Sequence, residues 1–378
     1  MPPTIWLISG EASGDLYGAG LARAIRQRCP DAAIRGMGGV EMKAAGVEIM
    51  VDSTELGIIG LWEAIKHLPF FIRLRKELVR RAAAERPDTV VMIDYPGFNL
   101  SLASRLHRLG IRVVWFISPQ VWAWRTGRIW KLARYCSRML CIFPFEPQYY
   151  APTTLKAEFI GHPLVSQLAP LRQPEDAREK NLLLLLPGSR RQELRRLLQP
   201  MLEAAALLHR QQPGLDFELA FPRQAIADYA EELISRMKLP DDMPPIRRSC
   251  GCTRQRMAVA TAAIAASGTV TVEAALLGLP VVVTYKVNAL TYWVARAVIK
   301  INTITIANLV CGRRVFEELV QADCTPEKLC AAATAILPGG SRRHFCLEGI
   351  RDFTASLGAA GDVSANAAAI ILDGEGRA

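Results

Sequence analysis

Five consecutive leucines near the middle of the chain, Leu182–Leu186, place the strongest constraint on its fold. An apolar run of this length, bounded by polar residues, is typical of a strand that is buried on both faces of a parallel sheet. Pro187 cannot donate to a sheet ladder, so we expect the strand to end there. Gly188 and Ser189 then turn the chain, and the apolar spacing after Arg190 predicts a helix.

This strand–turn–helix unit predicts a binding site for a phosphate group. The first turn of a helix exposes free backbone N–H groups at the positive end of the helix dipole. Arg190 would add the planar donors of its guanidinium group. The same stretch also fits an ordinary turn with a surface arginine, and both interpretations stay open at this point.

A second turn of this kind lies downstream. A small-residue strand is followed by Ser267, Gly268 and Thr269 at the start of a predicted helix. Thr271 adds a third hydroxyl group, and Glu273 could accept hydrogen bonds from the ribose hydroxyls of a nucleotide. Helix capping is the alternative for this stretch alone. Two such turns in one domain favour a phosphate-bearing ligand.

The first predicted strand, Ile5–Ser9, leads into a glycine turn with two carboxylates. Glu11 and Asp15 would repel a phosphate, so together with Ser13 they suit the hydroxyl groups of a sugar. Simple helix capping by Ser13 or Asp15 is the alternative. The G-x-x-x-G spacing also differs from the G-x-G-x-x-G dinucleotide fingerprint, so we expect no dinucleotide cofactor here.

Asp94 is the candidate general base. It follows the predicted strand Thr89–Ile93, and the carboxyl ends of parallel strands border the crevice where doubly wound folds bind ligands. Because no cationic residue is close to Asp94 in sequence, its carboxylate could take a proton from a substrate hydroxyl. An aspartate that only caps a turn is the alternative.

A basic span follows Asp94. No acidic residue occurs between Tyr95 and Phe145, whereas seven arginines and one lysine do. A surface of one charge predicts an anionic partner, either a lipid surface, a phosphorylated ligand or a nucleic acid, with a solvated basic face as the alternative. Within this span Trp122, Trp124 and Arg125 predict an aromatic wall that packs the domain or stacks on a sugar ring.

The segment Leu56–Arg81 mixes large apolar and basic side chains. Residues such as Trp62, Phe70, Phe71 and Arg73 suit a helix that lies in a membrane interface. A helix that is buried on the sheet, with a basic outer face, fits the same pattern equally well.

The whole-chain features bound the remaining possibilities. A length of 378 residues predicts two or three domains, and a linker rich in proline and charge is expected at 170–181. We predict domains at 1–170 and 180–340, with helices over 341–378.

No apolar run of about 18 residues and no signal-peptide pattern occur, which favours a cytoplasmic protein without a spanning helix. Nine scattered cysteines and five histidines predict no metal site. Residues Asn302–Asn308 are predicted to be strand-like.

These stretches together resemble the lipid A disaccharide synthase family, inverting glycosyltransferases of bacterial outer-membrane synthesis. The resemblance runs from about residue 5 to residue 320. Its motifs, in order, are SGEASGD (Ser9–Asp15), IDYPGFN (Ile93–Asn99), SPQVWAWR (Ser118–Arg125), FPFE (Phe143–Glu146), FIGHPL (Phe159–Leu164), LLPGSR (Leu185–Arg190), SGTVTVEA (Ser267–Ala274) and PVVVTYK (Pro280–Lys286).

The resemblance implies a fold and a reaction. The fold is GT-B, an α/β architecture of two Rossmann-like, doubly wound parallel-sheet domains with a cleft between them. The amino-terminal domain takes the acceptor and the carboxy-terminal domain holds the UDP-sugar. The reaction joins UDP-2,3-diacylglucosamine to 2,3-diacylglucosamine 1-phosphate and yields a β-1,6-linked disaccharide 1-phosphate. No cofactor or metal is implied.

The resemblance also assigns residues. Asp94 and Arg190 match the critical residues of the family, and Asn99 belongs to the motif on the acceptor side. Asn308 matches the family's late asparagine, but Ala307 stands where a proline is usual, so this loop departs from the family pattern. The family further implies a peripheral protein on the anionic cytoplasmic face of the inner membrane. Its carboxy-terminal helices either cross back or contribute to a homodimer.

Two alternatives remain. Another GT-B UDP-sugar enzyme, either an N-acetylglucosamine transferase of cell-wall synthesis or a 2-epimerase, would use the same phosphate turns. The epimerase would not need the interfacial segment, and the transferase is not expected to carry the WAWR motif. A nucleic-acid-binding protein is disfavoured, because the chain carries no RNP or helix-turn-helix pattern.

Overall fold

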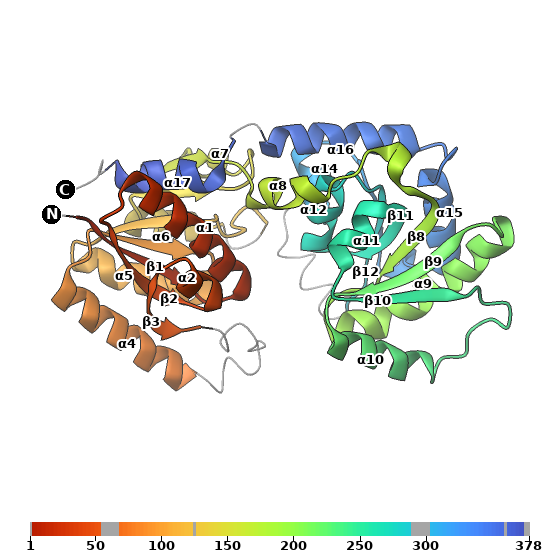
Figure 1. The fold of residues 1–378 in the computed structure, drawn as a ribbon, viewed down its shortest axis with the longest axis horizontal. Helices are drawn as coiled ribbons and strands as arrows, with labels where there is room; N and C mark the ends of the chain where they lie inside the picture. The colour runs from red at the N-terminus through yellow and green to blue at the C-terminus, as the bar shows by residue number, and fades with distance from the viewer. Residues whose placement is uncertain (1, 54–67, 124–125, 289–302, 359–360, 374–378) are drawn as a thin grey trace. The chain divides into compact units, whose positions relative to one another are not determined.

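The computed structural model describes residues 2–53, 68–123, 126–288, 303–358 and 361–373. It divides into two compact units, which are unit 1, Met1–Pro163 with Leu357–Ala378, and unit 2, Leu164–Ser356. Each unit contains one sheet with helices on both faces (Figure 1). Every strand pair in the described residues is parallel, which confirms the predicted α/β class with two doubly wound sheets.

The sheet of unit 1 has the order β3-β2-β1-β4-β5-β6-β7. The strands are β1 Thr4–Ser9, β2 Ala33–Gly38, β3 Glu48–Asp52, β4 Thr89–Ile93, β5 Arg112–Phe116, β6 Arg138–Cys141 and β7 Lys156–Phe159. The order reverses between β1 and β4, which pair directly. Doubly wound folds bind ligands beyond the carboxyl ends of the strands at such a switch point.

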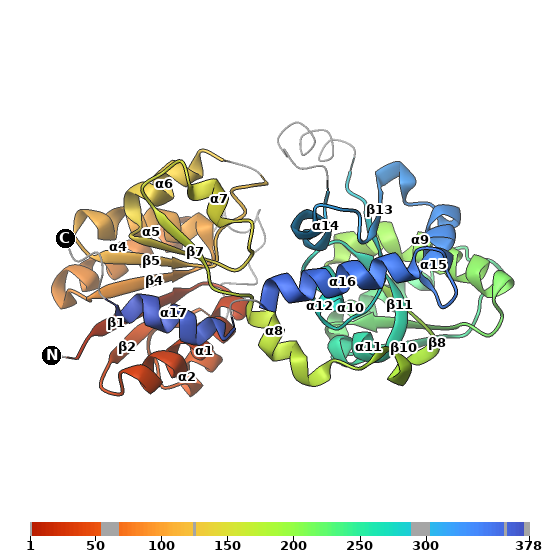
Figure 2. The same ribbon diagram turned by 90° about the horizontal axis from the view of Figure 1, so that it is seen from above.

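Two helical layers cover this sheet. Helices α1 (Ala12–Arg28), α2 (Val40–Ala44) and α17 (Val363–Leu372) lie on one face (Figure 2). Helices α4 (Leu68–Glu85), α5 (Pro96–Arg108) and α6 (Arg128–Tyr135) lie side by side on the other face. The short helix α7 (Pro147–Tyr150) belongs to the same unit, whereas α8 (Pro163–Leu168) begins where the chain passes into unit 2.

The end of the chain packs against unit 1. Buried Arg112 of β5 donates to the carbonyl oxygens of Ile371 at 2.6 Å and Ile370 at 3.0 Å, which are among the last carbonyls of α17. A cation at the carboxyl end of a helix also complements the helix dipole. The Asn366 side chain donates to the carbonyl of Ile160 at 3.2 Å. The helix α17 is therefore held by unit 1 of its own chain.

The sheet of unit 2 has the order β10-β9-β8-β11-β12-β13. Its strands are β8 Glu179–Leu186, β9 Asp216–Phe221, β10 Ile246–Cys250, β11 Ala260–Ala266, β12 Val281–Tyr285 and β13 Glu317–Val320. The main helices are α9 Arg191–Gln211, α10 Gln224–Ile234, α11 Thr253–Val259, α12 Thr269–Leu276, α14 Ile306–Cys311, α15 Pro326–Ile336 and α16 Arg343–Gly358. The five leucines of β8 are buried, as predicted, and the order reverses between β8 and β11.

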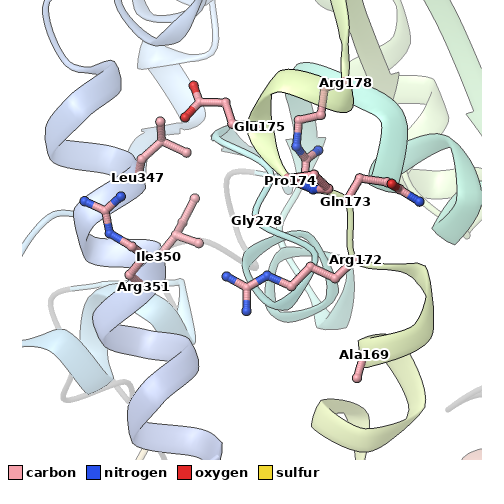
Figure 3. A pocket seen from close by; sticks show the side chains of 10 residues that line it. All are labelled: Ala169, Arg172, Gln173, Pro174, Glu175, Arg178, Gly278, Leu347, Ile350 and Arg351. Carbon is pink, nitrogen blue, oxygen red and sulfur yellow. The ribbon is translucent and has the colours of Figure 1, made fainter.

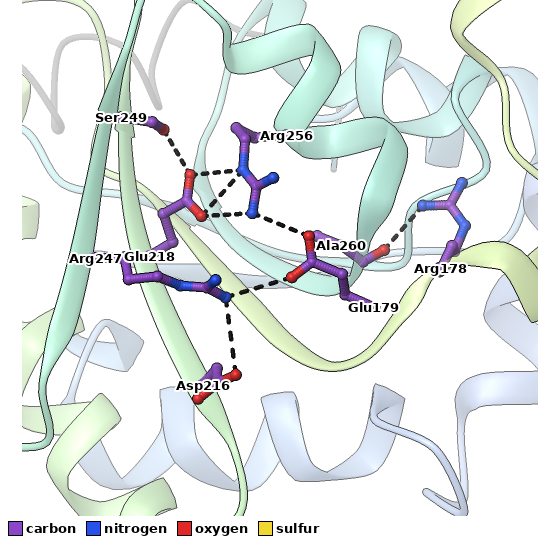
Figure 4. Close-up of polar contacts among 8 residues, drawn as sticks. All are labelled: Arg178, Glu179, Asp216, Glu218, Arg247, Ser249, Arg256 and Ala260. Atoms are coloured by element: carbon purple, nitrogen blue, oxygen red, sulfur yellow. Dashed lines mark hydrogen bonds and ion pairs between the residues drawn. The ribbon is translucent and has the colours of Figure 1, made fainter.

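An ion-pair network ties one edge of this sheet to α11. Buried Glu218 of β9 accepts hydrogen bonds from Arg256 Nε at 2.8 Å and from Ser249 Oγ of β10 at 2.6 Å (Figure 4). Arg256 also pairs with Glu179 at 3.2 Å. A buried carboxylate needs such partners to offset its loss of hydration. The network therefore fixes α11 on the strands beneath it.

Two parts of the fold depart from expectation. The predicted strand over Asn302–Asn308 is wrong, because helix α14 begins at Ile306 after a short irregular stretch. The β-branched residues there favour a strand locally, but buried Glu318 of β13 binds the N–H groups of Ile304 and Thr305 at 3.0 and 3.1 Å. The strands β3, β10 and β13 were not predicted. Each is four or five residues long and is the outermost strand of its sheet, so its apolar pattern is weak.

The stretch Arg343–Leu372, of which the structure describes 343–358 and 361–372, is apolar and long enough to cross a membrane by length and composition. It contains the two helices α16 and α17. Phe353 and Leu357 of α16 are fully buried, as is Ala367 of α17. These apolar side chains therefore serve packing within the protein.

Candidate functional site

A cavity of about 690 Å³ opens at the switch point of unit 2. The carboxyl ends of β8, β9 and β11 border it. Seven of the residues predicted for nucleotide binding line this cavity, namely Gly188, Ser189, Arg190, Ser267, Gly268, Thr269 and Glu273. The two turns that the sequence singled out therefore face one space, although about 80 residues separate them in the chain.

The turn before α12 offers donors to that space. Gly268 has a φ of 151°, a conformation that favours glycine, and no side chain caps the helix. The first N–H groups of a helix have no partner within the helix, so those of Thr269 and Val270 can serve a ligand. Thr271 is buried, and its hydroxyl donates to the Gly268 carbonyl at 2.8 Å. It shapes the turn and does not line the cavity.

In the turn before α9, backbone N–H groups already bind a carboxylate of the protein itself. The Glu193 carboxylate accepts the N–H groups of Ser189 at 2.8 Å and Arg190 at 3.2 Å. Arg190 Nη1 donates to the same carboxylate at 3.3 Å, and the Arg190 side chain is 80% exposed. This arrangement shows that the turn accommodates a carboxylate, but also that a phosphate could use these N–H groups only by displacing Glu193.

The structure adds residues that the sequence did not indicate. Arg254, near the start of α11, lines the cavity and donates to Glu273 Oε1 from Nε at 3.0 Å and Nη2 at 2.6 Å. Thr253 and Gln255 lie beside it. The only local signal was a polar CTRQR stretch after an unpredicted strand. The anchor at Arg256 explains how Arg254 on the same short helix is held over the cavity.

Asn308 does not line this cavity. Its amide nitrogen donates to the Phe316 carbonyl at 2.9 Å and to Glu318 at 2.8 Å, and its amide oxygen accepts the Phe316 N–H at 2.8 Å. The side chain is buried, and these three bonds satisfy most of its hydrogen-bonding capacity. Asn308 holds the start of α14 against β13 in this structure.

Asp94 lies at the switch point of unit 1, directly after β4. Asp94 and Tyr95 have left-handed φ values of 45° and 49°, and Asn99 Nδ2 donates to the Asp94 carbonyl at 2.8 Å. Strained backbone of this kind is frequent at functional sites. Burial first, and the charge of Glu11 second, raise the pKa of Asp94 to about 6. The carboxyl is therefore ionised at neutral pH and more basic than an ordinary aspartate.

The other residues of the predicted acceptor mouth follow β1, with Glu11 just before α1 and Ser13 and Asp15 in its first turn. Glu11 and Ser13 are exposed, and Glu11 is close enough to Asp94 to act on its charge. Asp15 is buried and accepts the N–H groups of Gly39 at 2.6 Å and Glu41 at 2.9 Å. Asp15 thus caps the start of α2 and points away from solvent.

The structure describes only part of the predicted aromatic wall. Trp124 and Arg125 lie outside the described residues. Trp122 is buried, and its ring meets the edge of Phe145 at a centroid distance of 5.2 Å.

Asn99 is also buried, and its Oδ1 has no hydrogen-bond partner among the described residues.

The α4–α5–α6 layer forms a cationic face with exposed aromatic rings. Phe70 is 41% exposed and Trp130 of α6 is 61% exposed, whereas Phe71 is half-buried against Phe98. Arg73 is exposed, and Trp62 lies outside the described residues. The exposed cations of this layer are Arg73, Lys76, Arg80, Arg105, Arg108, Lys131 and Arg134. The two acids in these helices, Glu77 and Glu85, are both paired with arginines.

A second cavity, of about 390 Å³, lies in unit 2 between the segment before β8 and α16. Arg172 extends toward α16, from which Leu347 and Ile350 point back (Figure 3). Arg178 at its wall is buried and donates to the carbonyls of Met257 and Ala260. Burial and the neighbouring arginines lower the pKa of Arg178 to about 10. None of the predicted site residues that the structure describes lines this cavity.

Comparison with known proteins identifies the relatives of this chain. A family model described as lipid-A-disaccharide synthetase matches residues 5–371. A lipid-A-disaccharide synthase of Myxococcus xanthus is 37% identical over 377 residues, which cover 98% of this chain and 97% of that protein.

The solved structures that resemble it share the fold at low identity. The glycotransferase of kitacinnamycin has a TM-score of 0.65 and 16% identity, and the match covers 99% of each chain. A structure described as an S. aureus MnaA-UDP co-structure has a TM-score of 0.64 and 10% identity, over 97% of this chain and 94% of that one. These likenesses confirm the predicted GT-B class.

Proposed function

This chain belongs to the lipid-A-disaccharide synthase family, and from that premise we propose how it carries out its reaction. It is a glycosyltransferase of lipid A biosynthesis. The donor in our proposal is UDP-2,3-diacylglucosamine and the acceptor is 2,3-diacylglucosamine 1-phosphate. The product is the β-1,6-linked disaccharide 1-phosphate, formed with inversion at the anomeric carbon.

The observation that carries the donor assignment is the convergence of both turns on the 690 Å³ cavity. The N–H groups at the start of α12 and the guanidinium of Arg190 are suited to the diphosphate. Glu273 is suited to the ribose, because Arg254 occupies only its Oε1 and leaves Oε2 for a hydroxyl donor. In this scheme, N–H groups and a guanidinium group of the protein stabilise the negative charge of the departing diphosphate, and no metal ion is used.

Asp94 is the general base in this proposal. With a pKa of about 6, the carboxylate is ionised at neutral pH. This pKa is also closer to neutral pH than that of an ordinary aspartate, as favours a general base. It would take the proton of the acceptor hydroxyl as the oxygen attacks the anomeric carbon. A single displacement of this kind converts an α-linked donor into a β-linked product. Arg190 would stabilise the leaving UDP.

The test of this function is the product of the purified protein. With both acylated substrates present, we expect one equivalent of UDP for each disaccharide 1-phosphate, measured by mass analysis. Release of UDP without a disaccharide, or conversion of the sugar nucleotide at its C2 position, would instead support the 2-epimerase alternative.

We also propose that the α4–α5–α6 layer rests on the anionic cytoplasmic surface of the inner membrane. Its exposed cations are suited to acidic headgroups, at about 1 kcal/mol for each cation near the surface. The rings of Phe70 and Trp130 are suited to the interface itself, where amphipathic aromatic residues gather. Both acylated substrates reside in such a membrane.

Replacing both rings, Phe70→Ser with Trp130→Ser, should lower binding to vesicles that contain phosphatidylglycerol at least about tenfold, since each buried ring contributes up to about 3 kcal/mol. A vesicle flotation assay measures this. Val40→Ser is the matched control, because Val40 is 69% exposed on α2 at the opposite face of the sheet. Unchanged binding of the double variant would contradict the membrane assignment.

A further inference from the structure

Glu146 is a buried carboxyl group that the mechanism above does not use. Its side chain is 1% exposed. One oxygen, Oε2, accepts the N–H groups of Ile142 at 3.1 Å and Phe143 at 3.0 Å. The other oxygen, Oε1, accepts Nε1 of Trp122 at 3.3 Å. Glu146 therefore joins the turn after β6 to the indole ring of the predicted acceptor wall.

The sheet places this group near the base. Strands β4, β5 and β6 are neighbours, and Asp94, Ser118 and Ile142 each follow the end of one of them. The carboxyl of Glu146 is close enough to Asp94 for the charge of Asp94 to raise its pKa. Two carboxyl groups thus share the carboxyl edge of the sheet in unit 1.

Among the described residues, the other titratable groups around Glu146 bring no positive charge to it. The thiol of Cys141 lies on β6, and the hydroxyl of Tyr150 lies on α7, where it bonds Ser118 Oγ at 2.9 Å. The ring of His162 contacts Phe143, and burial lowers the pKa of His162 to about 4, so this ring is neutral. Glu11 and Tyr95, the titratable neighbours of Asp94, are acidic groups and bring no positive charge either.

Burial is the main reason that Glu146 resists ionisation. Desolvation raises its pKa to about 8 against the opposing effect of its three N–H donors, and the charge of Asp94 adds to the increase. At neutral pH the two carboxyl groups then carry a single negative charge, on Asp94.

We propose that Glu146 is a positioning residue of the acceptor side, which fixes the indole of Trp122 and holds a proton beside the base Asp94. This role rests on the proposed function, because it presumes that Asp94 accepts the proton of the acceptor hydroxyl. When Glu146 loses its proton, a second negative charge appears next to Asp94. That charge changes the basicity of Asp94, so the reaction rate changes as well.

The test is the pH dependence of kcat/KM between pH 5 and pH 10 for the wild-type protein and for Glu146→Gln. We expect the wild-type profile to rise through about pH 6 and to change again near pH 8. The variant should keep the first transition and lose the second. At pH 7 its kcat/KM should fall about tenfold, mostly through KM for the acceptor, because glutamine has one acceptor oxygen and cannot serve both the Trp122 N–H and the two backbone N–H groups.

Two matched variants control for structural damage. Glu158→Gln removes a half-exposed carboxylate of β7 and should keep the wild-type profile. Trp122→Phe keeps the Glu146 carboxyl but removes its indole partner, so the rate transition near pH 8 should persist. Thermal melting shows whether each variant is folded.

A second readout needs no substrate. Tryptophan emission of the wild-type protein should change near pH 8, where Glu146 ionises beside the indole, and this change should be absent in both Glu146→Gln and Trp122→Phe. A Glu146→Gln variant that keeps the rate transition and the emission change overturns the proposal. Failure of Asp94 as the base would appear separately, as turnover by Asp94→Asn, and would leave the emission result standing.

Discussion

Asp94→Asn is expected to lower kcat at pH 7 by about 10³-fold or more, within the range that a positioned general base contributes. The amide has the shape of the carboxyl group but cannot take a proton. The affinity for UDP should stay within about twofold, because the cavity that we assign to UDP belongs to unit 2 and Asp94 belongs to unit 1. Steady-state kinetics and calorimetry with UDP measure the two effects.

The pH dependence of kcat/KM provides a second test of Asp94, and an exposed aspartate provides the control variant. Since burial and Glu11 raise the pKa of Asp94 to about 6, kcat/KM of the wild-type protein should fall as the pH drops through 6 and the base becomes protonated. Asp31→Asn, at an exposed aspartate after α1, should keep both the rate and this transition. Substantial turnover by Asp94→Asn would remove Asp94 from the role of base.

Arg190→Ala is expected to lower kcat/KM by about 10²- to 10³-fold, the loss typical of one preorganised donor to a developing anion. The melting temperature should change little, because the Arg190 side chain is 80% exposed and, within the described part of the chain, pairs only with Glu193. In the substrate complex the guanidinium group would shift from Glu193 to the diphosphate.

Arg191→Ala is the matched control for Arg190→Ala. Arg191 is the next residue and is also exposed, but its guanidinium lies over the ring of Tyr229 and it does not line the cavity. We expect near wild-type kinetics from it. Equal activity of the two variants would mean that Arg190 has no part in stabilising the leaving group.

The sequence predicted the parts of the fold that depend on local pattern. The leucine run of β8 indicated a strand buried on both faces, and the turns after β8 and β11 are visible as small residues before helices. Parallel sheets bring the carboxyl ends of adjacent strands together, so Arg190 and Ser267 were expected to face one site, and they line one cavity.

The residues that the sequence did not reveal depend on tertiary contacts. Arg254 reaches the cavity because Arg256 anchors a short helix to buried Glu218, and neither pairing leaves a sequence pattern. Glu146 is buried, and it accepts a hydrogen bond from Trp122, which lies 24 residues away in the chain. Conversely, Asp15 looked like a residue of the sugar mouth, but its carboxylate is the cap of α2, which is 24 or more residues away in the chain.

The Glu193 carboxylate sharpens the interpretation of the first phosphate turn. The sequence suggested free N–H groups before α9, whereas the structure shows two of them bound to this side chain. The turn before α12 is the one without a side-chain cap. Diphosphate binding in our scheme therefore begins at α12, and Arg190 contributes through its guanidinium group.

The most direct test of the central claim is the configuration of the new glycosidic bond in the product formed from the α-linked UDP donor. The anomeric proton coupling in the NMR spectrum of the isolated disaccharide 1-phosphate gives this configuration. A single displacement assisted by Asp94 predicts a β-1,6 linkage. An α linkage, or a disaccharide formed at the wild-type rate by Asp94→Asn, would contradict it.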